Sequence, residues 1–579
     1  MFPSSKRRLM RLAATAVLLA ACARPEPADL VLRNGKIVTM DSARPEAQAI
    51  AITGYTITAV GSNRRIGRYV GPNTEVIDLA GQLAVPGFIE GHGHFMGLGG
   101  AKMILDLTTA TSWDDIVAMV AQAARSARPG EWIRGRGWHQ EKWTSVPEPA
   151  VDGVPVHASL SRVSPNNPVY LTHASGHAAF VNGRALQLAG ISRGTRNPPG
   201  GEIVHDASGN ASGLLRETAQ RLVGRAMDQA EAGRTPEDVE AQLREQVRLA
   251  GEDALAKGVT SFHDAGASFE TIDFYKKLEA EGVLPVRLYA MVRRESNEEM
   301  AEKLPRYRMV AEGNDFLTVR SIKRQIDGAL GSHGAWLLEP YVDMPASTGL
   351  VLEPVEDITR TAELAIQHGF QVNTHAIGDR GNREVLDLYA KVFAANPDKR
   401  DVRWRIEHAQ HLHPDDIKRF AELGVIASMQ GVHATSDGPW VPKRLGEERS
   451  KSGAYVWRSL LDAGAVVTNG TDVPVEDISP LASFYASVSR MTREGTAFYP
   501  EQRMTREEAL RSYTLAAAYS AFEEAIKGSL SPGKLADVAV LSKDIMTVPE
   551  AEIPTAQVMY TIVGGKVAYR RPTSADDRR

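Results

Sequence analysis

Two histidines separated by a single glycine stand directly after an apolar segment near the start of the chain. They are His92 and His94, and the apolar segment covers residues 83–89. On a β-strand, side chains at positions i and i+2 point to the same side. At the end of a strand two imidazoles can therefore reach one divalent cation. The pair predicts part of a metal site.

Three further residues of metal-binding type stand at the ends of other segments with a strand pattern. His375 follows the segment 370–374, His408 ends the segment 403–408 and Asp472 follows the segment 466–471. If these segments are parallel strands of one barrel, their carboxyl ends meet at the same mouth. Imidazole nitrogen and carboxylate oxygen are ligands typical of zinc first, and then of manganese, iron or cobalt. The sequence predicts one centre for one or two divalent metals.

The middle of the chain, residues 85–525, alternates between strand and helix patterns. Eight strands are expected, at Leu83–Glu90, Gly258–His263, Val286–Met291, Leu317–Ile326, Phe370–Thr374, Arg403–Glu407, Val425–Met429 and Ala465–Asn469. Helical patterns such as 113–125 and 239–257 lie between most of them. This alternation predicts an α/β fold with a (β/α)₈ barrel like that of TIM. Residues 96–230 are expected to form an insertion after the first barrel strand, over the mouth.

The two ends of the globular part have short strand and turn patterns instead. Residues 29–84 and 526–572 are expected to form one small composite β-sandwich, followed by a tail at 573–579. Asn34-Gly35 and Gly564-Gly565 each separate two short apolar segments, and each predicts a β-hairpin.

The first 28 residues have the pattern of an export signal. A basic segment precedes a short apolar run at 12–21, which is too short to cross a bilayer as a helix. The run ends in Leu19-Ala20-Ala21-Cys22, which resembles the lipobox of bacterial lipoproteins. The resemblance implies cleavage before Cys22, lipidation of Cys22 and a tether at 23–28; an ordinary signal peptide is the alternative. The expected product is exported and anchored to a membrane by its N-terminal lipid only, facing the periplasm or the cell exterior.

The amino-acid composition limits the kinds of metal site and binding partner that the chain can have. The single Cys excludes internal disulfides and cysteine-based zinc or iron–sulfur sites. With 67 Lys and Arg against 71 Asp and Glu, the net charge of −4 does not suggest nucleic-acid binding, and no phosphate-loop motif is present. We therefore expect a small-molecule substrate, no nucleic acid, and an oligomeric state that the sequence leaves open.

Several motifs resemble the amidohydrolase superfamily. Pro86-Gly87-Phe88-Ile89 with the histidine pair resembles its first-strand signature. The stretches 258–264, 327–332, 374–380 and 528–537 resemble its YtcJ-like (amidohydrolase 3) branch, and the likeness runs from about residue 29 to residue 569. The resemblance implies a barrel with a composite β-sandwich. It also implies a metal centre whose ligands are His92, His94, His375, His408 and Asp472.

The resemblance adds two roles. It implies that Lys323, when carboxylated, bridges two metals, whereas an unmodified structural lysine would leave one metal. It also implies that Asp472 takes a proton from the attacking water and passes it to the leaving group. A divalent cation lowers the pKa of bound water and gives hydroxide near neutral pH. Polar Arg324 and Gln325 next to Lys323 depart from the apolar residues common in the branch.

Other residues are candidates for the substrate pocket. His433, after the seventh strand, stands where it could stabilise an oxyanion, although a plain loop histidine is the alternative. His177 matches a recurrent position of the family, and Trp138 and His139 are expected to line the pocket with it. His173 and Trp143 are weaker candidates. No role is predicted for six other histidines, which are His157, His205, His333, His368, His411 and His413.

The leading interpretation is an enzyme that hydrolyses a carbon–nitrogen bond other than a peptide bond, most simply an N-acyl or formamide-like amide. Deamination of a cyclic amidine is an alternative, but Gly378-Asp379 stands where deaminases of the superfamily carry Glu. Lactone or ester hydrolysis is possible on the same site. A ligand-binding lipoprotein without catalytic activity is the alternative outside the enzymes.

Overall fold

The computed structural model describes residues 25–145 and 148–572. Cys22 and the expected signal peptide lie outside the described residues, as does the tail at 573–579. Within the described ranges, no helix has the length and apolar character needed to span a membrane.

Eight parallel strands form the centre of the molecule. In order around the sheet they are β8 (Phe88–Gly93), β17 (Val259–Ala267), β18 (Arg287–Val292), β20 (Leu317–Gln325), β21 (Gln371–Ala376), β22 (Arg405–His408), β23 (Ile426–Gln430) and β24 (Val467–Gly470). The backbone N–H of Asp472 donates to the carbonyl of His92 at 2.8 Å, which joins the end of the last strand to the first. The eight-stranded, nearly closed barrel confirms the predicted fold class.

The predicted first strand is divided in two. Residues Leu83–Pro86 form β7, which belongs to the sandwich, and the barrel strand β8 begins at Phe88. Pro86 lacks a backbone N–H, and a Cβ on Gly87 would lie 2.2 Å from Thr260 Oγ1. The Pro-Gly pair therefore lets one continuous apolar run serve two sheets.

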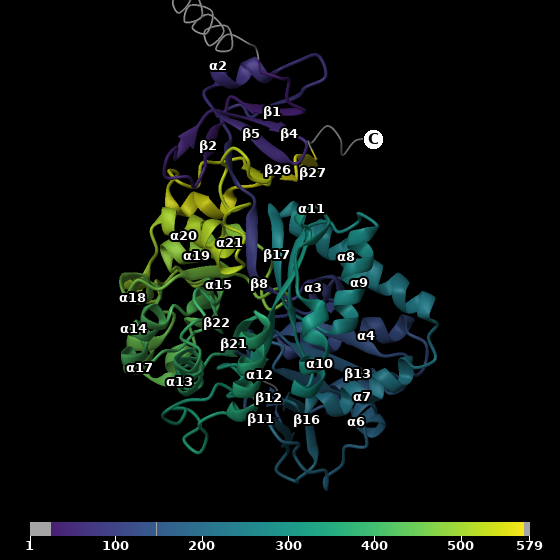
Figure 1. Ribbon diagram of the computed structural model, residues 1–579. Coiled ribbons are helices and arrows are strands. Elements are labelled where there is room, and N and C mark those ends of the chain that lie inside the picture. The colour runs from purple at the N-terminus through teal and green to yellow at the C-terminus, as the bar shows by residue number, and fades with distance from the viewer. Residues whose placement is uncertain (1–24, 146–147, 573–579) are drawn as a thin grey trace, which may run out of the picture.

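Helices follow the strands on the outside of the barrel (Figure 1). The main ones are α8 (Pro236–Ala256), α9 (Phe269–Ala280), α10 (Asn297–Tyr307), α12 (Val355–His368), α13 (Asp379–Ala395), α14 (Pro414–Leu423), α18 (Trp457–Asp462), α19 (Pro480–Ser489), α20 (Arg506–Ser512) and α21 (Leu515–Ser520). The side chains of Thr235, Ser268 and Ser296 cap the first three. Gly369 and Gly424 end α12 and α14 in the left-handed conformation.

The insertion between β8 and β17 has a sheet and a core of its own. Its sheet has the order β15 (Gly201–His205), β16 (Ala211–Glu217), β14 (Ala178–Val181), β13 (Val169–His173), β10 (Ile133–Trp138) and β9 (Leu105–Asp106). The helices are α4 (Trp113–Ser126), α5 (Ala158–Val163), α6 (Gly183–Leu188) and α7 (Gln220–Glu231). Trp113, Trp138 and Phe180 lie in the core under α4.

Strands from both ends of the chain build the sandwich. One sheet has the order β5 (Thr56–Gly61), β4 (Ala49–Thr53), β1 (Leu30–Arg33) and β6 (Glu75–Asp78). The other has the order β27 (Lys566–Arg570), β26 (Val558–Val563), β25 (Val538–Leu541), β7, β2 (Lys36–Val38) and β3 (Glu46–Ala47). Figure 1 shows strands from both ends of the chain together at one end of the barrel.

One of the two predicted hairpins is wrong. The strands β1 and β2, on either side of Asn34-Gly35, lie in different sheets and do not pair with each other. The turn carries the chain from one sheet to the other, so that Leu32 of β1 and Ile37 of β2 pack in the same core between the two sheets. The hairpin at Gly564-Gly565 is confirmed, since β26 and β27 pair antiparallel.

Candidate metal centre

The six predicted ligands lie at the carboxyl ends of the barrel strands. His92 is in β8, His375 in β21 and His408 at the end of β22. His94 follows β8 directly, and Asp472 lies two residues after the end of β24. Lys323 is near the end of β20. His94 is half-buried, and the other five are 0–7% exposed. The barrel therefore brings together residues that are up to 380 positions apart.

Asp472 is at the middle of the group. Its Oδ1 lies 3.2 Å from His94 Nε2 and 3.5 Å from His92 Nε2. Lys323 Nζ lies 3.3 Å from His92 Nε2. Ligand atoms of His92, His94 and Asp472 all lie within 4.8 Å of one another, and the same holds for His408, His433 and Asp472. Two possible metal positions thus share one carboxylate.

His375 completes the ring of imidazoles. Its ring centroid is 4.5 Å from that of His408. Its Nε2 lies 3.5 Å from Asp327 Oδ1 but has no hydrogen-bond partner among the described residues. A buried nitrogen of this kind is costly unless a ligand satisfies it.

Residues that sequence reasoning missed orient the imidazoles. His92 Nδ1 donates to Glu407, and His408 Nδ1 donates to Gln430 Oε1 at 2.8 Å. These contacts leave each Nε2 free of a proton and facing the centre. Glu407 is fully buried in β22 directly before His408, but no local pattern of the sequence pairs it with His92.

The backbone at two ligands is held in an unusual conformation. His408 has a φ of 77° and Asp472 a φ of 56°, in the left-handed region that costs a non-glycine residue roughly 1–3 kcal/mol. The bond from the Asp472 N–H to the His92 carbonyl stabilises this geometry.

Burial sets the charges at the centre. It lowers the pKa of His92, His375 and His408 well below the ordinary value, so these imidazoles are neutral. Burial, helped by the Arg293 guanidinium, lowers the pKa of Lys323 to about 7. Burial alone would raise the pKa of Asp472, but the hydrogen bond from His94 and the nearby imidazoles hold it well below its usual range. Neutral imidazoles around a carboxylate fit a divalent cation.

Two connected chambers meet at this centre. Both are lined by His177, His375, His408 and Asp472. The smaller chamber has apolar walls from Leu330, Ile377, Trp440 and Val475. The larger, of about 530 Å³, is lined mainly by charged and polar side chains. A volume of this size is ordinary for a small-molecule site.

The insertion supplies part of the walls. His139, His173 and His177 line the chambers, and His177 Nδ1 lies 2.9 Å from Glu217 Oε2. Trp138 does not line them: it is 1% exposed, donates to the Leu171 carbonyl and stacks on Trp143 in the core of the insertion. A tryptophan next to a pocket histidine on a strand points to the opposite face.

The sequence matches the model of the amidohydrolase family over residues 75–569. The chain belongs to the amidohydrolase family. Membership makes it a metal-dependent hydrolase that acts on carbon–nitrogen bonds, and it confirms the predicted resemblance.

Three relatives resemble this amidohydrolase along nearly all of its length. Protein LONG AFTER FAR-RED 3 of Arabidopsis thaliana is 36% identical, over 94% of this chain and 92% of its own. Putative amidohydrolase YtcJ of Bacillus subtilis is 31% identical, over 93% and 99%. N-substituted formamide deformylase of Arthrobacter pascens is 28% identical, over 94% and 99%.

A solved structure resembles the amidohydrolase in three dimensions. It is that of an uncharacterized metal-dependent hydrolase from Pyrococcus furiosus, with 27% identity and a TM-score of 0.68. The match covers 90% of this chain and 100% of that one.

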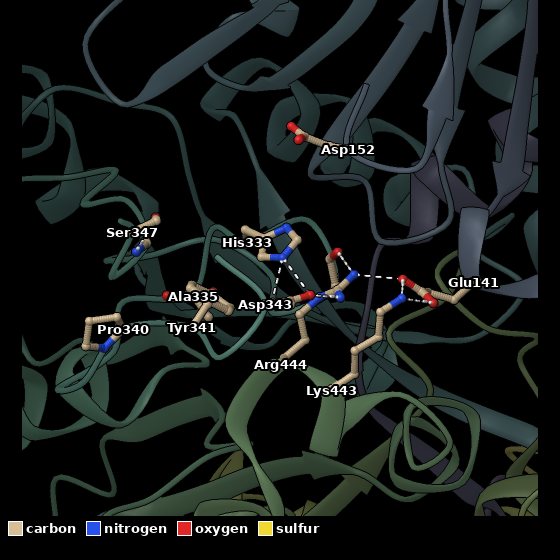
Figure 2. Close-up of polar contacts among 12 residues, drawn as sticks. Glu141, Asp152, His333, Ala335, Pro340, Tyr341, Asp343, Ser347, Lys443 and Arg444 are labelled. Carbon is tan, nitrogen blue, oxygen red and sulfur yellow. Dashed lines mark hydrogen bonds and ion pairs between the residues drawn. The ribbon is translucent and has the colours of Figure 1, made fainter. Parts of the chain in front are cut away.

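A charged clasp fastens the insertion of this amidohydrolase to the barrel (Figure 2). Arg444 of α16 (Val441–Leu445) donates to Asp343 and, at 2.9 Å, to Glu141 Oε1. Lys443 lies 3.1 Å from Glu141 Oε2, and His333 Nε2 lies 3.2 Å from Asp343 Oδ1. Glu141 is two residues after His139, so the clasp fixes one wall of the smaller chamber.

Proposed function

We propose that this amidohydrolase cleaves the carbon–nitrogen bond of a small-molecule amide of the N-acyl or formamide type. The observation that carries the proposal is the pair of possible metal positions that share Asp472 where two chambers meet. The two chambers offer room for the two halves of an amide on either side of the centre.

One or two divalent cations, zinc first, would be held by His92, His94, His375, His408 and Asp472. Such a cation supplies Lewis acidity and activates water at neutral pH. The ionised Asp472 carboxylate is placed to accept the proton of the attacking water and to return it to the leaving nitrogen. Water is thereby added across the C–N bond, which gives an acid and an amine.

His433 is suited to stabilise the carbonyl oxygen as it becomes negative. Gln410 Nε2 lies 3.0 Å from His433 Nδ1, and an amide nitrogen only donates, so Nδ1 accepts. The neutral ring then carries its proton on Nε2, which is buried and has no partner among the described residues. This N–H supports a catalytic role as a hydrogen-bond donor. In that role His433 is not a ligand, and a second cation would be held by His375, His408 and Asp472 without it.

Lys323 is proposed to bridge two cations as its carbamate. Carbamate formation needs a neutral amine, and a pKa of about 7 supplies one at neutral pH. Its 3.3 Å distance to His92 Nε2 supports a position among the ligands. An unmodified Lys323 would restrict the site to one cation.

The relative named N-substituted formamide deformylase supports the amide class. Deamination is less well supported, because Asp379 Oδ1 accepts the N–H of Leu338 and the residue lines neither chamber. The carboxylate at that position is therefore not placed to act on a ring amidine in either chamber.

The test is a panel of formamides, N-acyl amino acids, dipeptides, lactones and ring amidines. We expect amine release from amides, and a fall of about 10²–10⁴-fold in kcat for Asp472→Asn. Asp477→Asn, which changes an exposed partner of Lys257, is the matched control and should keep its activity. Turnover of lactones or ring amidines alone would overturn the proposal.

We also propose that the protein is an exported lipoprotein, on the strength of the lipobox-like sequence before Cys22. Labelled fatty acid should be incorporated by the parent and not by Cys22→Ser. Equal labelling of the two would contradict lipidation at Cys22.

A further inference from the structure

Four arginines line the larger chamber. Arg136 comes from β10 of the insertion, Arg221 from α7, and Arg293 and Arg294 follow β18. Within the part of the chain that the structure describes, no ion pair joins any of them to a carboxylate. The chamber therefore presents guanidinium groups that no direct ion pair neutralises.

Apart from Asp472 of the metal centre, the acidic side chains in the same chamber are already engaged. Glu217 pairs with His177, and Glu353 lies 3.4 Å from Arg324. Asp264 accepts a hydrogen bond of 2.7 Å from the Tyr275 hydroxyl. These contacts leave the arginines as the side chains available to an incoming ligand.

The position of Arg293 is fixed by its surroundings. Its Nη2 donates to Gln325 Oε1 at 2.7 Å, and Gln325 lies two residues beyond Lys323 on β20. Gly266 has a φ of +149°, and a Cβ there would lie 2.3 Å from Arg293 Cδ. The missing side chain of Gly266 thus makes room for the side chain of Arg293. The polar residue that departs from the branch pattern, Gln325, orients this guanidinium.

Arg136 is held from the side of the insertion. Its Nε donates to the carbonyl of Pro474 at 3.0 Å and its Nη2 to the carbonyl of Ala174 at 2.8 Å. Pro474 is two residues after Asp472, so this guanidinium lies beside the loop that carries the shared ligand. Burial lowers the pKa of Arg136 and Arg293 to about 10, which leaves both cationic at neutral pH.

We propose that the substrate is an amide that carries a carboxylate, and that Arg293 and Arg136 bind this carboxylate in the larger chamber. The apolar half of the molecule occupies the smaller chamber against Leu330, Ile377 and Trp440. Guanidinium groups match a carboxylate in shape and charge. A neutral amide would leave two partly buried cations unpaired, and the site disfavours it for that reason. This inference rests on the proposed function, since it specifies the amide.

The first test measures binding to the metal-loaded protein by calorimetry, with hydrocinnamate and hydrocinnamyl alcohol as probes. We expect the carboxylate to bind at least about 30-fold more tightly than the alcohol, and to lose this advantage in Arg293→Met and in Arg136→Met. Arg134→Met is the control, because it changes an exposed arginine of β10, the strand that also carries Arg136. This variant should keep the preference for the carboxylate. Equal affinity of the parent for the two probes would overturn the inference. A preference for the carboxylate that persists in both arginine variants would also overturn it, because the metal alone would then hold the carboxylate.

The second test compares kcat/KM for N-formylphenylalanine and N-formylphenethylamine, which differ only in the carboxylate. The ratio should favour the acid and should fall by about 30-fold or more in Arg293→Met. Cleavage of the neutral formamide at an equal or higher rate would overturn the inference and leave the proposed function standing. If neither formamide is cleaved but the binding of hydrocinnamate still depends on both arginines, the proposed function fails and the anion site stands.

Discussion

At the scale of single residues, the metal ligands could be predicted because side chains of ligand type stand at the ends of predicted strands. His92, His94, His375, His408 and Asp472 each lie at or just after the end of a predicted strand, and parallel strands bring such ends together. The residues that orient them were not predictable, because Glu407 reaches His92 across the barrel and Gln430 reaches His408 from the next strand. Only the folded barrel shows these contacts.

Glu407→Gln tests the orienting contact. The variant keeps an acceptor for His92 Nδ1 but removes the negative charge that makes the imidazole a better ligand, so zinc affinity should fall by about 10- to 100-fold. Competition with a chromophoric chelator measures the affinity. Glu422→Gln, on the exposed side of α14, is the control. Unchanged affinity in Glu407→Gln would show that the contact does not tune the centre.

At the scale of elements, local patterns predicted barrel strands and helices better than they predicted pairing. The helix expected at 113–125 is α4, and the helix expected at 239–257 is α8. The Asn34-Gly35 hairpin failed because its flanking strands find partners elsewhere, β1 with β4 and β2 with β7. The insertion was expected, but its mixed sheet depends on pairings between distant strands that no local pattern encodes.

The clasp between the insertion and α16 can be tested with Arg444→Met. Arg444 is almost fully buried, and its loss leaves Glu141 and Asp343 without their shared partner. We expect the free energy of unfolding to fall by about 3 kcal/mol and amide exchange to rise around residues 139–143. Urea unfolding and hydrogen exchange measure the two effects.

Lys443→Met is the matched control, because Lys443 also pairs with Glu141 but is exposed. It should cost less than about 1 kcal/mol. Equal losses in the two variants would argue that burial of Arg444 does not strengthen the clasp.

At the scale of the whole molecule, one buried ion pair joins the barrel to the sandwich. Arg287 at the start of β18 donates to Asp537 at 2.8 and 3.1 Å, and Asp537 directly precedes β25. Asp537 Oδ1 also accepts the N–H of Gly564 in the β26–β27 turn. The C-terminal strands of the sandwich are thereby tied to the part that carries the metal centre.

Asp537→Ala should lower the free energy of unfolding by about 3–5 kcal/mol, since it leaves a buried guanidinium unpaired. The loss should appear in barrel and sandwich signals at the same urea concentration. Lys543→Met, which breaks an exposed pair with Glu552, should cost less than about 1 kcal/mol. If the sandwich of Asp537→Ala unfolds at a lower urea concentration than the barrel, the two parts do not unfold as one cooperative unit.

The metal content of the purified protein, measured beside Lys323→Ala and His92→Ala, tests the central claim most directly. The shared Asp472 and a carboxylated Lys323 predict about two divalent cations per chain in the parent. One or fewer should remain in Lys323→Ala, and amide turnover should be lost with them. A parent protein that binds no divalent cation would contradict the assignment of this centre.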